Sequence, residues 1–406
     1  MEYSFIEALN KILQVSNPWQ IGNIELNELR KKVDVYIDYS KGSQFACPVC
    51  KKISKIHDSS YRQWRHLDIC DYRCYLHIKI PRTNCPAHGV KVIKEMDFGR
   101  INTHFSFKFE QLIMSKVREM SVSAIAKEIG EVDTTIWSVL NYYIPKAIAK
   151  QLDLSATKRI GVDETSNKPG HSYTTIFTDS ETKKVIFVTQ GKDQETFGAF
   201  YQEMFQHMGE PNNIEQISMD MSKSFIAGKE FYFPTAEVVF DRFHIKKGLN
   251  EAIDTVRKQE VKSNEILKET KYIWLKNEKN LTEKQKETLG DFLKDCSTNT
   301  AKAYSLKNGF DELWKVQNQA VEPLLEEWCK KADALILAPV NKFVKTLKNH
   351  WKGVLNSITT QVTNAFAEGL NSIVQLVKSR ARGFRNHDNF KNMIYLLGND
   401  LNFTFH

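Results

Sequence analysis

The sequence contains no uninterrupted apolar run long enough to cross a membrane, and it begins with Glu2 and Glu7 where a signal peptide would carry basic residues. We therefore expect a cytoplasmic protein without a membrane partner. Cysteine is also scarce. The chain has seven, an odd number, and most of them lie in the first quarter. This distribution favours metal ligation in a reducing compartment over a framework of disulfides.

The charge balance is moderately basic. Lys and Arg number 57 against 49 Asp and Glu, which gives a net charge of +8 at pH 7. Such a surplus favours a polyanionic partner, with nucleic acid first and an anionic membrane surface second. A hydrophobic content of 41% is ordinary for a soluble globular protein, and 406 residues allow two or more domains.

Two short motifs predict a structural zinc site. They are Cys47-Pro-Val-Cys50 and Cys85-Pro-Ala-His88. Each motif separates two ligands by two residues, as the tight knuckle of a zinc site requires, and a few dozen residues lie between the motifs. We expect Cys47, Cys50, Cys85 and His88 to bind Zn²⁺. The alternative is that these are ordinary loop residues.

Other cysteines and histidines nearby have simpler interpretations. Apolar and polar residues alternate over residues 32–39 and again from Cys70 onward, which predicts two half-buried strands. Cys70 and Cys74 would then be small core residues on the apolar face of the second strand. His57 and His66 could replace a zinc ligand, but we interpret them as polar loop residues.

Residues 105–148 have the periodicity of helices. An apolar stripe runs from Val122 to Ile129, Gly130 interrupts it, and Asp133 can cap a second helix with its own apolar stripe. This is the layout of a DNA-binding helix-turn-helix, although any helical hairpin shows the same stripes. The expected DNA contacts near the start of the second helix are Thr134, Thr135 and Trp137.

Strand and helix patterns alternate through the next hundred residues. The predicted strands are 158–166, 173–178, 185–189, 215–219 and 236–240. Short turns join the first three, which predicts an antiparallel meander, and helices separate the last two. This order predicts a mixed α/β sheet.

Aspartates mark three of these strands. Ile160 and Val162 point to one face of the first strand and Asp163 to the other, and we expect Asp163 to leave the strand near its end. Asp220 follows the fourth strand, and Asp241 follows the fifth. A lone aspartate at such a position is usually a turn or cap residue, but two strand-borne carboxylates make a better metal site.

The remaining sequence predicts helices. Residues 260–350 are rich in Lys, Glu, Asn and Leu, contain several tryptophans, and are interpreted as helices inserted into the α/β domain. Residues 360–389 predict a further helix, whose polar face carries Asn364, Glu368, Asn371 and Gln375. Basic residues follow that face: Lys378, Arg380, Arg382 and Arg385. Taken alone, Glu368 would be a surface glutamate.

Taken in their order along the chain, these motifs resemble those of the DDE transposases of bacterial insertion sequences, and most closely the ISL-three group. The resemblance rests on the two zinc motifs, on Gly161-Val-Asp163-Glu, on Asp241-Arg-Phe-His244 and on Asn364-Ala-Phe-Ala-Glu368. It continues to Asn389-Phe390 and so spans nearly the whole chain. It implies an α/β fold whose RNase H-like mixed sheet holds a helical insertion and follows a zinc-binding module and a helix-turn-helix.

The resemblance also implies the division into domains. These are a zinc-binding module at 1–100, a helix-turn-helix domain at 101–150, the first part of the catalytic domain at 151–258, the insertion at 259–350, and the last part of the catalytic domain at 351–406.

The implied catalytic carboxylates are Asp163, Asp220 and Glu368, with Asp241 as the alternative to Asp220. They would hold Mg²⁺ or Mn²⁺ for cleavage of double-stranded DNA at terminal inverted repeats and for strand transfer, while Zn²⁺ is structural. Lys378, Arg380, Arg382 and Arg385 would hold DNA beside the catalytic metals. The resemblance further implies a homodimer on DNA in a bacterial, nucleoid-associated setting. The rivals are an RNase H-like nuclease or resolvase, and a non-catalytic DNA-binding regulator derived from a transposase.

Overall fold

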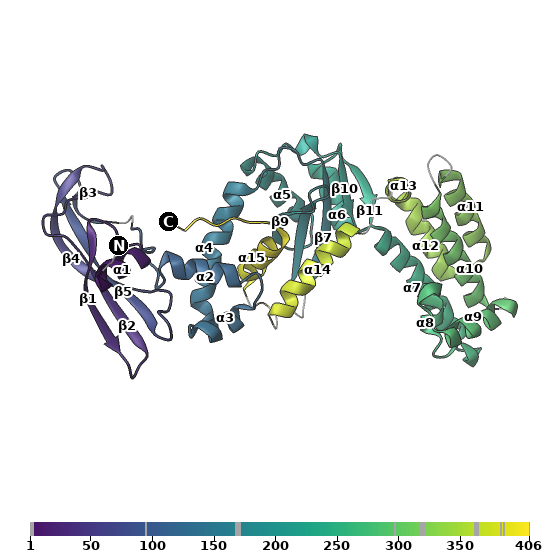
Figure 1. Ribbon diagram of the computed structural model, residues 1–406. Coiled ribbons are helices and arrows are strands. Elements are labelled where there is room, and N and C mark those ends of the chain that lie inside the picture. Colours follow the sequence, from purple (N-terminus) through teal and green to yellow (C-terminus); the bar gives the residue numbers. More distant parts are fainter. Residues whose placement is uncertain are drawn as a thin grey trace. The chain divides into compact units, whose positions relative to one another are not determined.

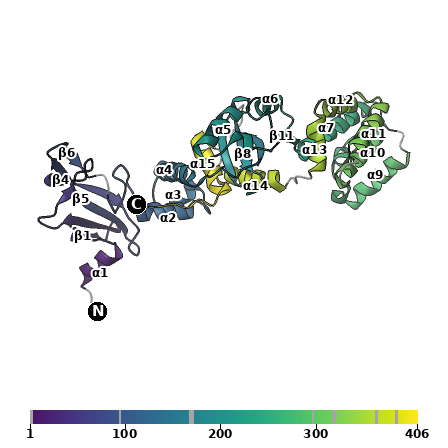
Figure 2. The same cartoon turned by 90° about the horizontal axis from the view of Figure 1, so that it is seen from above.

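The computed structural model describes the chain except residues 1–3, 94–95, 167–171, 296–297, 317–320, 361–364, 382–383, 385 and 406, and except the side chains of residues 5, 295, 365–368 and 370. The chain divides into two compact units, residues 1–147 with 401–406, and residues 148–400. Figures 1 and 2 show their elements. Within the described ranges, no helix combines the length and apolarity needed to cross a bilayer.

The N-terminal unit is built on a six-stranded sheet that follows helix α1 (Phe5–Ile12). Its strands are β1 (Trp19–Asn27), β2 (Lys32–Tyr39), β3 (Phe45–Ala46), β4 (Ile53–Arg65), β5 (Arg73–Cys85) and β6 (Gly89–Val92). They are ordered β1-β2-β5-β4-β3, and β6 pairs with β5. The predicted strand at 32–39 is confirmed as β2, and its alternating apolar residues Val35 and Ile37 are fully buried.

Cys70 does not lie on the apolar face of a strand, so that prediction is wrong. β5 begins only at Arg73, and Cys70 is exposed in the preceding turn with a φ of +56°. The backbones of Ile69 and Tyr72 hydrogen-bond to each other across this turn. The alternation of apolar and polar residues therefore begins in the turn, before the strand itself starts. Cys74 is buried as predicted.

Three helices complete the N-terminal unit: α2 (Phe107–Lys116), α3 (Val122–Ile129) and α4 (Asp133–Gln151). The predicted arrangement of helix, glycine turn and helix is confirmed for α3 and α4. Gly130 ends α3 with a φ of +68°, a left-handed conformation that favours glycine. Asp133 is the first residue of α4 itself and does not precede it as a cap.

The last residues of the chain belong to the N-terminal unit. The Arg118 guanidinium donates to the Leu401 carbonyl at 3.0 Å, and the Phe405 ring lies 4.8 Å from the ring of Tyr143 on α4. The chain therefore passes between the two units twice, once within α4 and once after Asp400.

The second unit contains a five-stranded mixed sheet (Figure 1). Its strands are β7 (Arg159–Ser166), β8 (Tyr173–Asp179), β9 (Val185–Gln190), β10 (Gln216–Met219) and β11 (Glu237–Phe240). They are ordered β11-β10-β7-β8-β9. β7, β8 and β9 form the predicted antiparallel meander, while β10 pairs in parallel with both β7 and β11.

Helices cover both faces of this sheet. α5 (Glu195–Gln206) and α6 (Lys223–Tyr232) cover the face of Ile160 and Val162, where the rings of Phe177 and Phe200 stack 4.5 Å apart. α14 (Ala365–Arg380) lies against β7, and α15 (His387–Gly398) lies against β9. The Tyr395 hydroxyl of α15 accepts a hydrogen bond from the Val188 backbone at 3.1 Å. α14 and α15 therefore cover the face that carries Asp163.

A group of helices separates β11 from α14, as predicted. It comprises α7 (Arg242–Glu260), α8 (Lys271–Leu275), α9 (Glu283–Asp295), α10 (Asn299–Glu312), α11 (Val321–Ala334), α12 (Ala338–Asn349) and α13 (Trp351–Thr359). α10 and α12 pack on α7, and α13 returns to β11. Trp274, Trp314 and Trp328 are buried among these helices, while the indole of half-buried Trp351 donates to Glu322 at 2.9 Å.

Candidate metal centres

The four predicted zinc ligands lie together in the N-terminal unit. Their ligand atoms are all within 4.8 Å of one another. The sulfurs of Cys50 and Cys85 are 3.7 Å apart, and His88 Nδ1 lies 3.9 Å from the Cys47 sulfur. Two sulfurs bound at about 2.3 Å to one tetrahedral zinc ion would be separated by about 3.8 Å. The cluster therefore has the dimensions of a structural zinc site.

Local backbone geometry forms both knuckles. The Cys47 and Lys51 backbones close the first with hydrogen bonds of 2.8 and 2.9 Å, and the His88 backbone donates to the Cys85 carbonyl in the second. A hydrogen bond with His88 lowers the pKa of Cys85 to about 6, which favours the thiolate that a metal needs.

His57 and His66 are not part of this cluster. The prediction of polar loop residues is wrong for His57, which lies on a strand, and His66 lies after that strand but is buried. His57 is exposed on β4, whereas His66 is buried directly after β4, with Nδ1 2.8 Å from the Ser106 hydroxyl. Burial lowers the pKa of His66 to about 4, so this histidine is neutral near pH 7 and holds a polar contact inside the unit.

The register of the second sheet aligns three aspartates in one row. Ser218 of β10 pairs with Gly161 of β7, so continuing by two residues places Asp220 beside Asp163. Met219 pairs with Phe240 of β11, so one further residue places Asp220 beside Asp241. β7, β10 and β11 are parallel, and the row therefore lies toward their shared carboxyl edge, where open α/β sheets bind ligands. β7 continues to Ser166, so Asp163 lies within the strand and not at its end as predicted.

The two aspartates that follow β10 and β11 have different partners. Asp220 accepts one hydrogen bond, from the Ser222 backbone at 2.8 Å. Asp241 caps α7 by accepting from the Phe243 backbone at 2.8 Å, and its second oxygen lies 3.3 Å from Nδ1 of His244. One carboxylate oxygen of Asp241 is thus hydrogen-bonded, while the other lies near the His244 imidazole without a hydrogen bond to Nδ1.

Glu368 lies on α14, but its side chain is outside the described residues, as are Arg382 and Arg385. Lys378, farther along α14, donates from Nζ to the Thr165 hydroxyl at 2.7 Å. Thr165 shares a face of β7 with Asp163, so the helix that carries Glu368 packs on the strand that carries Asp163. Arg380 is half-buried on the same helix.

The predicted DNA contacts of the helix-turn-helix lie in the first turns of α4. Thr134 is exposed, whereas Thr135 and Trp137 are half-buried. The Thr135 hydroxyl donates to the Val132 carbonyl at 2.6 Å and so stabilises the start of the helix. Thr134 is the most accessible of the three.

Comparison with known families decides the identity. A family model described as a transposase, the ISL3-type DDE model, matches residues 160–394. The chain belongs to this transposase family. A second family model, described as the zinc-finger of transposase IS204/IS1001/IS1096/IS1165, matches residues 43–88, which hold the cysteine and histidine cluster. The mixed sheet with its helical insertion is thus the RNase H-like domain of a transposase, and the predicted family and fold class are confirmed.

Curated relatives agree with this assignment. The chain is 25% identical over 358 residues to the transposase for insertion sequence element IS1001 of Bordetella parapertussis, covering 85% of this chain and 86% of that protein. It is 22% identical over 373 residues to the transposase for insertion sequence element IS1557 of Mycobacterium tuberculosis, covering 84% and 82%.

Within the aspartate row of the transposase, the position of Asp163 is unfavourable for a charged carboxylate. Burial raises the pKa of Asp163 to about 6, and the nearby Asp241 and Asp220 carboxylates contribute to the rise. The Asp241 carboxylate in turn raises the pKa of His244, to which Asp163 and Asp220 also contribute. Repelling carboxylates with one nearby imidazole form a site that a divalent cation would stabilise.

Sequence reasoning assigned no role to three other residues at this site. His244 lies three residues after Asp241, so helical periodicity could have placed them on one face. Glu164 is half-buried near Asp220, and burial raises its pKa, while the charge of Lys192 lowers it. Lys192 lies 3.7 Å from the ring of Tyr173, and nothing local in the sequence predicts its proximity to the site.

Proposed function

We propose that this transposase cuts double-stranded DNA at the ends of an insertion sequence and joins those ends to target DNA, with Asp163, Asp220 and Glu368 holding two Mg²⁺ or Mn²⁺ ions. The observation that carries the proposal is the row of aspartates across β7, β10 and β11, beside a helix that bears Glu368. The printed names of the relatives, transposases for insertion sequence elements, support it.

The residues at this edge suit divalent cations. Carboxylate oxygens are the ligands that Mg²⁺ and Mn²⁺ prefer. Burial of Asp163 beside two other aspartates disfavours its charged form, and a bound cation would reverse that preference. When bound, two ions would activate the attacking oxygen and stabilise the leaving oxygen of an in-line displacement.

We assign the second catalytic carboxylate to Asp220 and not to Asp241. Asp220 follows β10, the immediate neighbour of β7, whereas Asp241 follows β11, one strand farther away. Asp241 also caps α7 through a hydrogen bond from the Phe243 backbone, and its other oxygen lies 3.3 Å from His244 Nδ1. On this assignment, Asp241 fixes the start of α7 and directs His244 toward the catalytic aspartates.

One site can serve both steps of transposition. Attack by water would break the phosphodiester at the end of the element and release a 3′-hydroxyl. Attack by that hydroxyl would then join the end to target DNA. Both steps are in-line displacements with the same development of charge, so the same carboxylates can serve each of them.

DNA recognition is assigned to the N-terminal unit. Residues 1–100 would form the zinc-binding module and residues 101–150 the helix-turn-helix domain, with Thr134, Thr135 and Trp137 of α4 near the bases. Lys378, Arg380, Arg382 and Arg385 would contact phosphates beside the catalytic edge. Pairing two ends requires two copies, so the working form on DNA would be a homodimer, acting in the cytoplasm.

A strand-transfer assay tests the proposed function. Wild-type protein, a labelled duplex carrying the element's own end, a supercoiled target plasmid and Mg²⁺ or Mn²⁺ are incubated together. We expect nicking at the end and covalent joining of the label to the plasmid, both abolished by EDTA. Cleavage without joining would favour a nuclease or resolvase. End binding with neither reaction would favour a DNA-binding regulator.

A further inference from the structure

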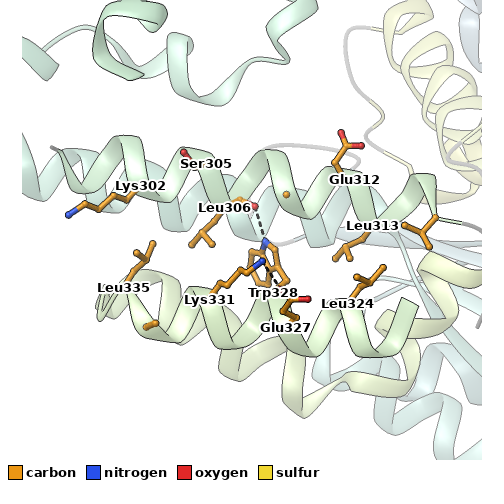
Figure 3. A pocket seen from close by; sticks show the side chains of 13 residues that line it. Lys302, Ser305, Leu306, Glu312, Leu313, Leu324, Glu327, Trp328, Lys331 and Leu335 are labelled. Atoms are coloured by element: carbon orange, nitrogen blue, oxygen red, sulfur yellow. Dashed lines mark hydrogen bonds and ion pairs between the residues drawn. The ribbon is translucent and has the colours of Figure 1, made fainter. Parts of the chain in front are cut away.

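An apolar groove lies between α10 and α11 in the helical insertion (Figure 3). Its volume is about 690 Å³, and its apolar lining comes from Leu306, Leu313, Leu324, Trp328 and Leu335. The Trp328 indole nitrogen donates to the Leu306 carbonyl at 2.8 Å, so its polar atom has a partner and its ring is left to form the floor. Leu324 remains 37% exposed at the wall. The groove is thus open, and two charged residues of its lining, Glu327 and Lys331, pair with each other at 2.7 Å.

Gly309 keeps this groove open. It lies in the interior of α10, where glycine is a poor helix former. A Cβ atom at this position would lie 3.6 Å from Cδ1 of Trp328, an ordinary contact, so packing does not exclude a side chain. The missing side chain therefore leaves space above the indole, and a larger residue would fill it.

Ile336 is an exposed residue next in sequence to a residue that lines the groove. It follows Leu335, a lining residue, in the turn between α11 and α12. Its side chain is 84% exposed, and its φ is +52°, a left-handed conformation that disfavours β-branched residues. Glycine or asparagine would suit this position at the end of a helix better. An exposed isoleucine held in a strained conformation points to a role outside the folding of its own chain.

We propose that this groove and Ile336 form a self-complementary interface with a second copy of the chain. Ile336 of each copy would enter the groove of the other. Gly309 and Ile336 each contradict a local preference, and such contradictions are expected where function requires them. Together they would provide the two halves of one contact, a recess at Gly309 and an exposed apolar side chain at Ile336.

The charges at the groove ends fit a two-fold arrangement. Lys302 lies at the end near Leu335, and Glu312, which also pairs with exposed Lys315 at 2.6 Å, lies at the opposite end (Figure 3). A two-fold axis across the groove makes the two grooves antiparallel, so that Lys302 of one copy faces Glu312 of the other. The same axis brings each Ile336 toward the end of the other groove that Leu313 and Leu324 line. The need for a second copy rests on the proposed function.

Two substitutions test the interface without weakening the fold. Ile336→Gly removes the projection and relieves the left-handed strain, and Gly309→Leu fills the recess with a better helix former. Sedimentation velocity of the full-length protein without DNA should show reversible dimers of the wild type. We expect each variant to raise the dissociation constant by about tenfold or more, without lowering the Tm. Ile266→Ala, which truncates a 71% exposed isoleucine elsewhere on this unit, should leave association unchanged.

Mixing the two variants tests the pairing itself. Ile336→Gly keeps an open groove, and Gly309→Leu keeps the projection, so the mixture should associate more tightly than either variant alone. A wild type that stays monomeric up to roughly 100 μM, a concentration that reveals any micromolar dissociation constant, would overturn the proposal. Unchanged dimers in both variants, or a mixture no tighter than its components, would also overturn it. None of these measurements requires catalysis, so a failure of the proposed function would be seen separately.

Discussion

Replacing Asp163 with asparagine is expected to abolish DNA cleavage and, at the same time, to stabilise the metal-free protein. The loss follows if Asp163 holds a catalytic cation, and we expect a decrease in rate of roughly 10³-fold or more, with end binding retained. The gain in stability follows because burial disfavours a charged carboxylate, and asparagine carries no charge. A rise in the Asp163 pKa from 3.8 to about 6 corresponds to roughly 3 kcal/mol against the folded state once the carboxylate is ionised.

The sign of this effect depends on pH in a defined way. The folded protein binds the Asp163 proton more tightly than the unfolded chain does, so this group favours folding at low pH. That contribution is lost as pH rises from about 4 to about 6. In EDTA, the stability gain of Asp163→Asn should therefore be full above pH 6 and absent near pH 4.

Urea unfolding between pH 4 and pH 8 in EDTA measures the gain. Asp193→Asn, which changes an exposed aspartate of the same unit, should alter neither stability nor cleavage. An Asp163→Asn protein that still cleaves DNA would remove Asp163 from the catalytic site. A variant less stable than the wild type at pH 7 would contradict the unfavourable burial of this charge.

Removing a zinc ligand should have the second large effect. Cys47→Ser is expected to release the metal and to unfold the part of the N-terminal sheet that holds both knuckles, because the cluster ties β3 and β4 to β5 and β6. Zinc binding to small structural sites contributes on the order of 10 kcal/mol to folding. End binding should fall by at least about tenfold, while the second unit stays folded.

Zinc content by mass spectrometry and hydrogen exchange over residues 43–92 report this change. Cys70→Ser provides the matched control, because Cys70 is an exposed cysteine outside the cluster. Cys47→Ser protein with one equivalent of zinc and unchanged exchange would contradict the ligand assignment.

The sequence predicts most of the features that position the catalytic edge. Strand periodicity places the meander and the two later strands, and the order of motifs gives the family. The strand predicted at 158–166 agrees with β7, but Asp163 lies within that strand and not near its end. The choice between Asp220 and Asp241 depends on strand order and on hydrogen bonds of the folded chain, which local sequence patterns do not encode.

Long-range contacts account for the features that sequence reasoning missed. Nothing local shows that residues 401–406 join the N-terminal unit, because Arg118 and Tyr143 lie more than two hundred residues earlier. The sequence indicates a polar loop residue at His66, but the fold buries its side chain against Ser106. The groove beside Trp328 likewise exists only once α10 and α11 have packed together.

Cleavage of a labelled transposon end by carboxylate variants tests the central claim most directly. Asp220→Asn, Asp241→Asn and Glu368→Gln are compared with the wild type in Mn²⁺, at protein concentrations that saturate end binding. The proposed assignment predicts that the Asp220 and Glu368 variants bind the end but do not cut it, whereas Asp241→Asn still cuts, more slowly. Cutting by Asp220→Asn together with none by Asp241→Asn would make Asp241 the second catalytic carboxylate and contradict the proposed site.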